Sequence, residues 1–384
     1  MPPKVTVLMA VRDGEPYVRE ALRSVLTQTF TDFEVLVVDD ASTDATVGVV
    51  EAFDDPRVRV LRNDRNLGQV PSLNRGMHEA RGEYIARIDA DDACLPARLA
   101  RQVDVLDAEP RVCLVGTWMQ AIDERGRRLG RLEKTLTDFV DFLYHTLIMR
   151  VYVSHPAAMY RREPVLALGG YDEATGPSED KDLWRKLVLE RYEARIVPQI
   201  LMLYRLHDRQ LSQVRAAHQR KLDCESQDRF LSALAPEANA PAVRRLLAGD
   251  PAAWDDDPKQ SLAGVELVLA GAHERLALAD DEVHRLTARV AARLLEVADG
   301  SPWRRPARIV AAHAIRHISG ERRTAARRRH AVALGLAPAI AGGRWAVRSA
   351  ADHTESLPGL GRLRARARRS RLARRLYAKA IGNE

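Results

Sequence analysis

The stretch GEYIARIDADDACLP, Gly82–Pro96, decides how the rest of the chain is interpreted. Its Tyr84–Ile88 portion is short, apolar and β-branched, which is typical of a buried strand. The carboxylates of Asp89, Asp91 and Asp92 follow it directly. Carboxylates crowded at the end of a buried strand repel one another and are costly to desolvate, unless a cation or ligand lies among them. The stretch therefore indicates a divalent-metal site, with capping of the helix that follows as the alternative.

Strand-like and helix-like segments alternate along the chain before this stretch. The expected strands are Val5–Val11, Phe33–Val38 and Val58–Leu61. The expected helices are Val18–Thr27, Thr46–Phe53 and Pro71–Ala80. This alternation favours an α/β fold with parallel strands, in which ligands bind beyond the carboxyl ends of the strands. Polar clusters at residues 12–14, 39–44 and 89–92 should therefore converge on one crevice.

A second acidic group lies further along, at the start of an expected helix. Ser178 is expected to cap this helix, which places Glu179, Asp180 and Asp182 in its first turn. There the backbone N–H groups and the helix dipole favour ionised carboxylates. Ordinary acidic decoration of a helix start is the usual explanation for such a group, so position alone assigns it no function. The segments expected between the two acidic groups are one or two strands over Val112–Ile122, a helix over Phe139–Met149 and a strand over Ser154–Tyr160.

The composition is that of an ordinary globular protein. The 384 residues are enough for about two or three domains, and a hydrophobic fraction of 46% can form a sizeable core. The three cysteines are too few and too widely spaced for a disulfide framework or a thiolate zinc site. The first apolar run is too short for a signal peptide, and no run reaches the roughly 20 apolar residues of a spanning helix. We therefore expect a cytoplasmic protein.

Charge is distributed unevenly along the chain. Residues 301–384 carry 20 Lys and Arg residues against 4 Asp and Glu, whereas residues 1–300 carry 40 against 49. Basic clusters interleaved with Leu, Tyr and Trp suit an amphipathic helix on an anionic membrane, such as the inner membrane face, at about 1 kcal/mol per basic residue. A solvated helix face or a disordered tail explains the segment equally well. Nucleic acid is not expected as a partner, because no nucleic-acid-binding motif accompanies the charge.

Three stretches together resemble the family 2 glycosyltransferases. They are VTVLMAVRDGEPYVREALRSVLTQTFTDFEVLVVDDASTDAT from Val5, NLGQVPSLNRGMHEARGEYIARIDADD up to Asp92, and VSHPAAMYRREPVLALGGYDEATGPSEDKDLWRKL up to Leu187. Their order and spacing carry the resemblance, which extends from Val5 to about Ser212. It implies the GT-A fold, a Rossmann-like mixed sheet flanked by helices, followed here by an α-helical C-terminal region. It also implies an enzyme that uses a nucleotide sugar.

The resemblance implies where the nucleotide diphosphate sugar lies, with UDP as the expected nucleotide. The backbone around Ala10 and Val11 and the carboxylate of Asp40 would hold the base. Asp89 would face the ribose or the metal. Asp91 would bind a divalent cation, Mn²⁺ or Mg²⁺, that bridges the diphosphate.

For the transfer itself the resemblance implies Asp180 as the catalytic base and His207 as a residue near the metal or the diphosphate. The chemistry agrees, because a cation stabilises charge on the leaving diphosphate and an attacking hydroxyl needs a carboxylate to take its proton. A single displacement of this kind inverts the anomeric configuration. The expected acceptor is a glycan or a lipid-linked molecule, in cell-surface polysaccharide biosynthesis. The chain departs from the family at Arg12-Asp13, where Tyr-Asn is more frequent.

We therefore expect a GT-A transferase domain over residues 1–212, a helical region over 213–300, and a basic tail, helical or partly disordered, over 301–384. Two other functions compete with this one. A receiver-like signalling protein also builds a magnesium and phosphoacceptor pocket from aspartates after strands, although the strand–helix pattern here outruns such a domain. A catalytically silent scaffold is the other alternative, and intact acidic positions speak against it: Asp40, Asp89, Asp91 and Asp180.

Overall fold

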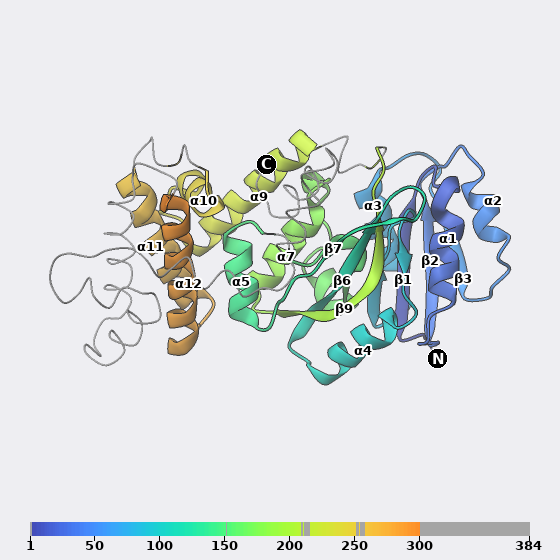
Figure 1. Cartoon of the computed structure of the whole chain (residues 1–384), viewed down its shortest axis with the longest axis horizontal. Helices are drawn as coiled ribbons and strands as arrows, with labels where there is room; N and C mark the ends of the chain where they lie inside the picture. Colours follow the sequence, from blue (N-terminus) through green and yellow to red (C-terminus); the bar gives the residue numbers. More distant parts are fainter. Residues whose placement is uncertain are drawn as a thin grey trace. The chain divides into compact units, whose positions relative to one another are not determined.

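The chain forms two compact units, the first ending at Pro236 and the second beginning at Glu237. The computed structural model in Figure 1 describes residues 2–150, 152–208, 210, 216–250, 253 and 258–299. The basic tail expected over residues 301–384 lies outside the described residues. Each unit is therefore described by itself.

One sheet forms the centre of the first unit, with the strand order β3-β2-β1-β4-β8-β6-β9-β5 and with β7 paired to β6. Its strands are β1 (Val5–Val11), β2 (Phe33–Asp39), β3 (Val58–Arg62), β4 (Tyr84–Arg87), β5 (Ala93–Cys94), β6 (Val112–Ile122), β7 (Arg128–Leu132), β8 (Met159–Arg161) and β9 (Glu193–Arg205). The first four strands are parallel. Strand β8 runs antiparallel to both β4 and β6, so the whole sheet is mixed, as the resemblance implied.

Helices cover this sheet on both faces (Figure 1). The helices of this unit are α1 (Glu15–Leu26), α2 (Thr46–Glu51), α3 (Gln69–Glu79), α4 (Arg98–Ala108), α5 (Phe139–Leu147), α6 (Arg162–Ala167), α7 (Glu179–Leu189) and α9 (Ala216–Leu234), with short 3₁₀ turns η1 (His155–Ala157) and η2 (Glu173–Thr175). Alternate residues of β1, from Val5 to Val11, share one core with α1 and α4. Leu8 points to the opposite face of the sheet, towards Gly76 of α3. A Cβ atom on Gly76 would lie only 2.3 Å from the Leu8 side chain. Burial on both faces explains the continuous apolar run of β1.

The expected strand over Ser154–Tyr160 is wrong in its first half. Residues His155–Ala157 form the 3₁₀ turn η1, and β8 begins only at Met159. The physical reason is Pro156, which has no N–H to donate to a strand ladder. The segment expected as one or two strands over Val112–Ile122 is the single strand β6.

The second unit is helical in its described part. It contains α10 (Ala240–Ala248), α11 (Pro258–Arg275) and α12 (Asp280–Asp299), which pack on one another. Gly249 ends α10 in the left-handed conformation that glycine adopts without strain. Helix α9 belongs to the first unit, although it lies beyond residue 212, where composition placed the end of the transferase domain. Among the described residues, no helix has the length and apolar character needed to cross a membrane.

Candidate active site

The acidic residues after β4 form a tight cluster at the end of the buried strand. One carboxylate oxygen from each of Asp89, Asp91 and Asp92 lies within 4.8 Å of the others. Helix α4 begins at Arg98, and Ala97 precedes it without any side-chain capping bond. The aspartates therefore do not cap the following helix, and that alternative is removed.

Two buried arginines contact this cluster. Arg87, on β4 itself, is 1% exposed and forms an ion pair with Asp89. Burial raises the pKa of Asp89, while the nearby positive charge of Arg87 opposes that rise. At the end of β9, Arg205 donates its backbone N–H to Asp92 Oδ1 (2.8 Å) and its Nε to the Asp91 carbonyl oxygen (2.9 Å). Arg87 thus offsets the charge of Asp89, and Arg205 holds the backbone of the acidic loop.

His207 lies beside Asp91, the residue expected to bind the cation. Its Nε2 is 2.8 Å from Asp91 Oδ2, although the two residues are 116 positions apart in the sequence. The His207 ring lies near the Tyr17 ring of α1, with centroids 5.4 Å apart. His207 is thus placed where it can orient the Asp91 carboxylate or share its ligand.

The three carboxylates fit a hard divalent cation. Their oxygens are the ligand type that Mg²⁺ and Mn²⁺ prefer, and they converge from one short loop. Asp92 Oδ2 is also buried and has no hydrogen-bond partner among the described residues. An orphaned buried carboxylate oxygen is costly, and a bound cation would remove that cost.

Asp180 lies in the first turn of α7, partly exposed, and its charge is close enough to act on Asp89. Burial raises the pKa of Asp180, and the adjacent Lys181 opposes that rise. Its neighbour Glu179 points into the protein, with Oε1 3.5 Å from His155 Nδ1. Burial, together with the charge of Asp180, raises the pKa of Glu179 to about 7. Two carboxylates of this turn, those of Glu179 and Asp180, thus lie within electrostatic range of Asp89 in the acidic loop.

The cap expected at Ser178 is only partly correct. Ser178 occupies the position before α7, but its side chain makes no capping hydrogen bond. Its hydroxyl oxygen is buried without a hydrogen-bond partner among the described residues. The reason is its backbone conformation, with ψ at 24° rather than in the extended region where capping side chains reach the next turn.

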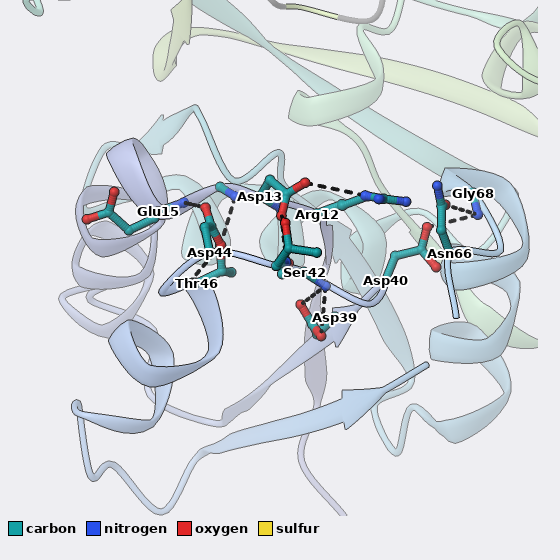
Figure 2. A network of polar contacts seen from close by, with 12 residues as sticks. Arg12, Asp13, Glu15, Asp39, Asp40, Ser42, Asp44, Thr46, Asn66 and Gly68 are labelled. Carbon is teal, nitrogen blue, oxygen red and sulfur yellow. Dashed lines mark hydrogen bonds and ion pairs between the residues drawn. The ribbon is translucent and has the colours of Figure 1, made fainter. Parts of the chain in front are cut away.

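The loops after β1 and β2 are joined by a polar network (Figure 2). Asp13 Oδ1 accepts a hydrogen bond from the Thr43 backbone N–H (2.7 Å), and the Glu15 backbone N–H donates to Asp44 Oδ2 (3.1 Å). Asp13 has a φ of +51°, a left-handed conformation that Asp and Asn tolerate best. Aspartate can therefore stand where the family more often has asparagine. The network holds the two loops side by side at one end of the sheet.

Ala10, Val11 and Asp40 lie together at this end. Ala10 pairs in register with Val38, and the Val11 carbonyl oxygen accepts a bond from the Asp40 backbone N–H (2.8 Å). The Asp40 carboxylate accepts three hydrogen bonds of 2.8 Å, and its donors are Asn63 Nδ2 and the backbone N–H groups of Leu67 and Gly68. Because a carboxylate offers about four acceptor positions, Asp40 can order the start of α3 and still accept one bond from a ligand.

Comparison with known proteins agrees with this geometry. The model of glycosyl transferase family 2 matches residues 6–169. An uncharacterised glycosyltransferase of Methanocaldococcus jannaschii is 31% identical over 211 residues, which are 54% of this chain and 72% of the relative. The chain belongs to family 2 of the glycosyltransferases. The glycosyltransferase EpsE of Bacillus subtilis is 32% identical to this family 2 enzyme over 50% of the chain and 68% of the relative.

The fold agrees with that of a solved glycosyltransferase. Staphylococcus aureus TarS, residues 1–349, superposes with a TM-score of 0.51 over 82% of this chain and 90% of that one, at 17% identity. This confirms the GT-A fold. Membership of family 2 also removes the receiver-like signalling protein as an alternative.

The sequence-based interpretation did not identify two arginines of this glycosyltransferase that contact the acidic loop. Arg87 had a visible signal, since it is a charge in the middle of the otherwise apolar strand YIARI. A buried charge needs a partner, and the acidic loop two residues later supplies one. Arg205 had no such signal, because its contacts with Glu20 (2.6 Å) and the acidic loop join segments far apart in the sequence.

Proposed function

We propose that this glycosyltransferase is metal dependent and inverting, and that it moves a sugar from a nucleotide diphosphate sugar to a glycan or lipid-linked acceptor. The observation that carries the proposal is the convergence of two acidic groups. The loop of Asp89 and Asp91 and the first turn of α7 with Asp180 lie within electrostatic range of each other. The reaction requires both a donor site and a base, and the two acidic groups would supply one each.

The nucleotide would lie over the ends of β1 and β2. The backbone of Ala10 and Val11 and the remaining acceptor position of Asp40 would hold the base, and Asp89 would face the ribose or the metal. Staphylococcal TarS has been solved with UDP and with UDP-GlcNAc, which makes UDP the first nucleotide to test here.

Asp91 would hold the divalent cation, with Asp89 and Asp92 close enough to contribute and His207 beside it. When bound, Mn²⁺ or Mg²⁺ would stabilise the negative charge that develops on the leaving diphosphate. Arg205 would keep the acidic loop in place through its bonds to the Asp91 carbonyl and the Asp92 carboxylate.

Asp180 would take the proton from the acceptor hydroxyl as its oxygen forms the new bond to the anomeric carbon. The bond from that carbon to the diphosphate breaks at the same time, and the nucleoside diphosphate leaves. Attack from the side opposite the leaving group inverts the anomeric centre. Lys181 favours the ionised form of Asp180, which the reaction needs.

The biological setting that we propose is polysaccharide biosynthesis. Relatives with 42%, 28% and 27% identity are named for succinoglycan biosynthesis in Rhizobium meliloti, amylovoran biosynthesis in Erwinia amylovora and O-antigen biosynthesis in Escherichia coli. Their shared theme supports a glycan acceptor for this chain.

The test is a panel of nucleoside diphosphates and nucleotide sugars measured by calorimetry, each with and without Mn²⁺ or Mg²⁺. We expect UDP to bind only with the cation, and saturation at 100 times its dissociation constant to stabilise the fold by about 2.7 kcal/mol. Equal binding with and without cation would contradict the metal dependence. Failure of every nucleotide to bind would contradict the proposed donor site.

A further inference from the structure

A pocket between α5 and α7 is lined by Lys181, the residue after Asp180, and by none of the residues of the proposed donor site. The two helices are in contact, and Figure 1 shows them in the same part of the first unit. The side chains that give the pocket its character are three aromatic and three cationic ones: Phe142, Tyr152, Trp184, Arg150, Lys181 and Arg185. The cavity has a volume of about 30 Å³, which leaves room for one small polar group of a ligand and not for a whole sugar.

Positive charge dominates this pocket. Asp223 of α9 is its counter-ion, with Oδ2 2.5 Å from Lys181 Nζ and Oδ1 2.5 Å from Arg185 Nη2. One carboxylate thus faces two cations. Arg150, which also lines the pocket, is exposed and adds a third positive charge.

A fourth cation lies close by on the segment between β7 and α5. Lys134 is near enough to Lys181 and Asp180 for both of their charges to act on it. Burial, with the positive charge of Lys181, lowers the pKa of Lys134 to about 8. An anion placed among these cations would relieve their mutual repulsion.

The position of the pocket indicates which substrate this anion would come from. The charge of Lys181 acts on Asp180, so an anion bound to the Lys181 ammonium group lies within electrostatic range of the proposed base. The proton that Asp180 takes belongs to the acceptor hydroxyl. A group held in this pocket would therefore belong to the acceptor rather than to the donor.

We propose that the α5–α7 pocket binds an anionic group of the acceptor, a phosphate or a carboxylate, and that the enzyme thereby selects anionic acceptors. This inference rests on the proposed function, because it uses Asp180 as the base. Lys134 and Arg150 supply charge at the edge of the pocket, and Lys181 directs the bound acceptor towards Asp180.

The test measures binding of small probes to the full chain by calorimetry, without donor and then with saturating UDP and Mn²⁺. Glycerol 3-phosphate represents the phosphate source and glucuronate the carboxylate source, with glycerol and glucose as their uncharged counterparts. The variants are Arg150→Gln, which changes an exposed side chain, and Lys134→Gln. The matched control is Lys221→Gln on α9, whose side chain is 72% exposed and pairs with Glu225.

We expect at least one anionic probe to bind, the uncharged probes not to bind, and the two pocket variants to weaken binding at least about tenfold, as for a lost charge-assisted hydrogen bond. The control should bind as the wild type does, and UDP affinity of each variant reports that it is folded. Equal binding of charged and uncharged probes would overturn the inference, and so would unchanged binding in Arg150→Gln. Loss of probe binding on addition of UDP would also overturn it, because the cations would then belong to the donor site. Because UDP binding is measured separately, loss of the acceptor-pocket inference can be told apart from loss of the proposed donor site.

Discussion

Asp180→Asn separates chemistry from binding at one residue. The substitution keeps the shape of the side chain but removes a charge from the first turn of α7, where a carboxylate gains about 0.3–1 kcal/mol from the helix dipole. Repulsion from Asp89 and Asp223 is relieved at the same time. These effects oppose each other, so the free energy of unfolding should change by less than about 1 kcal/mol.

The transfer rate should respond very differently. A positioned general base contributes roughly 10²–10⁴-fold, or about 2.7–5.5 kcal/mol of the activation barrier, and the asparagine side chain cannot accept the proton. Affinity for UDP and Mn²⁺ should stay close to that of the wild type, because Asp40, Asp89 and Asp91 are unchanged. The Asp180 carboxylate must be ionised to act, and burial raises its pKa. The wild-type transfer rate should therefore rise with pH through a pKa above the ordinary aspartate value. The transfer rate of the variant should not show this rise.

The assay compares the transfer rate, UDP affinity and unfolding by urea for Asp180→Asn and a matched control, Asp182→Asn. Asp182 lies in the same helical turn but faces α9, where its Oδ1 accepts from Ser226 Oγ (2.6 Å) and Arg229 Nη2 (3.2 Å). The control should lose about 1–3 kcal/mol of stability and retain transfer by the folded protein. Near-normal transfer by Asp180→Asn would refute the reasoning and leave the base unassigned.

Three further predictions concern the metal, a buried carboxyl group and the basic tail. Asp91→Asn should abolish the stabilisation by UDP and Mn²⁺, measured by calorimetry, while the fold persists; unchanged binding would exclude Asp91 as the ligand. The Glu179 pKa of about 7 lies above its ordinary value, so its stabilising effect is present at low pH and is lost as pH rises through 7. Glu179→Gln should therefore gain about 3 kcal/mol over the wild type in urea unfolding at pH 8 and little at pH 4. If residues 301–384 bind anionic lipid, truncation after residue 300 should release the protein from anionic vesicles, and salt should weaken binding of the intact chain. Equal sedimentation of both forms would contradict that role.

Much of the fold was predictable because its signals are local. The first three helices lie within a few residues of their expected positions, since apolar spacing records which face of a segment is buried. The strand expected over Ser154–Tyr160 failed because one residue, Pro156, overrides the apolar pattern. The partners of Asp40 were not predictable, because the donors from Leu67 and Gly68 depend on how the chain turns into α3.

The sequence by itself determined which residues are candidates for chemistry, because carboxylates placed directly after a buried strand or at a helix start are visible in the order of residues alone. Only the tertiary structure decided which of them meet. Strand β8 enters the sheet between β4 and β6, and β9 pairs with β6, so that His207 reaches Asp91 and the charge of Asp180 reaches Asp89. The physical reason is that strand pairing joins segments distant in sequence through backbone hydrogen bonds. Every residue can accept such a bond and every residue except proline can donate one, so the pairing leaves no signature in the side chains.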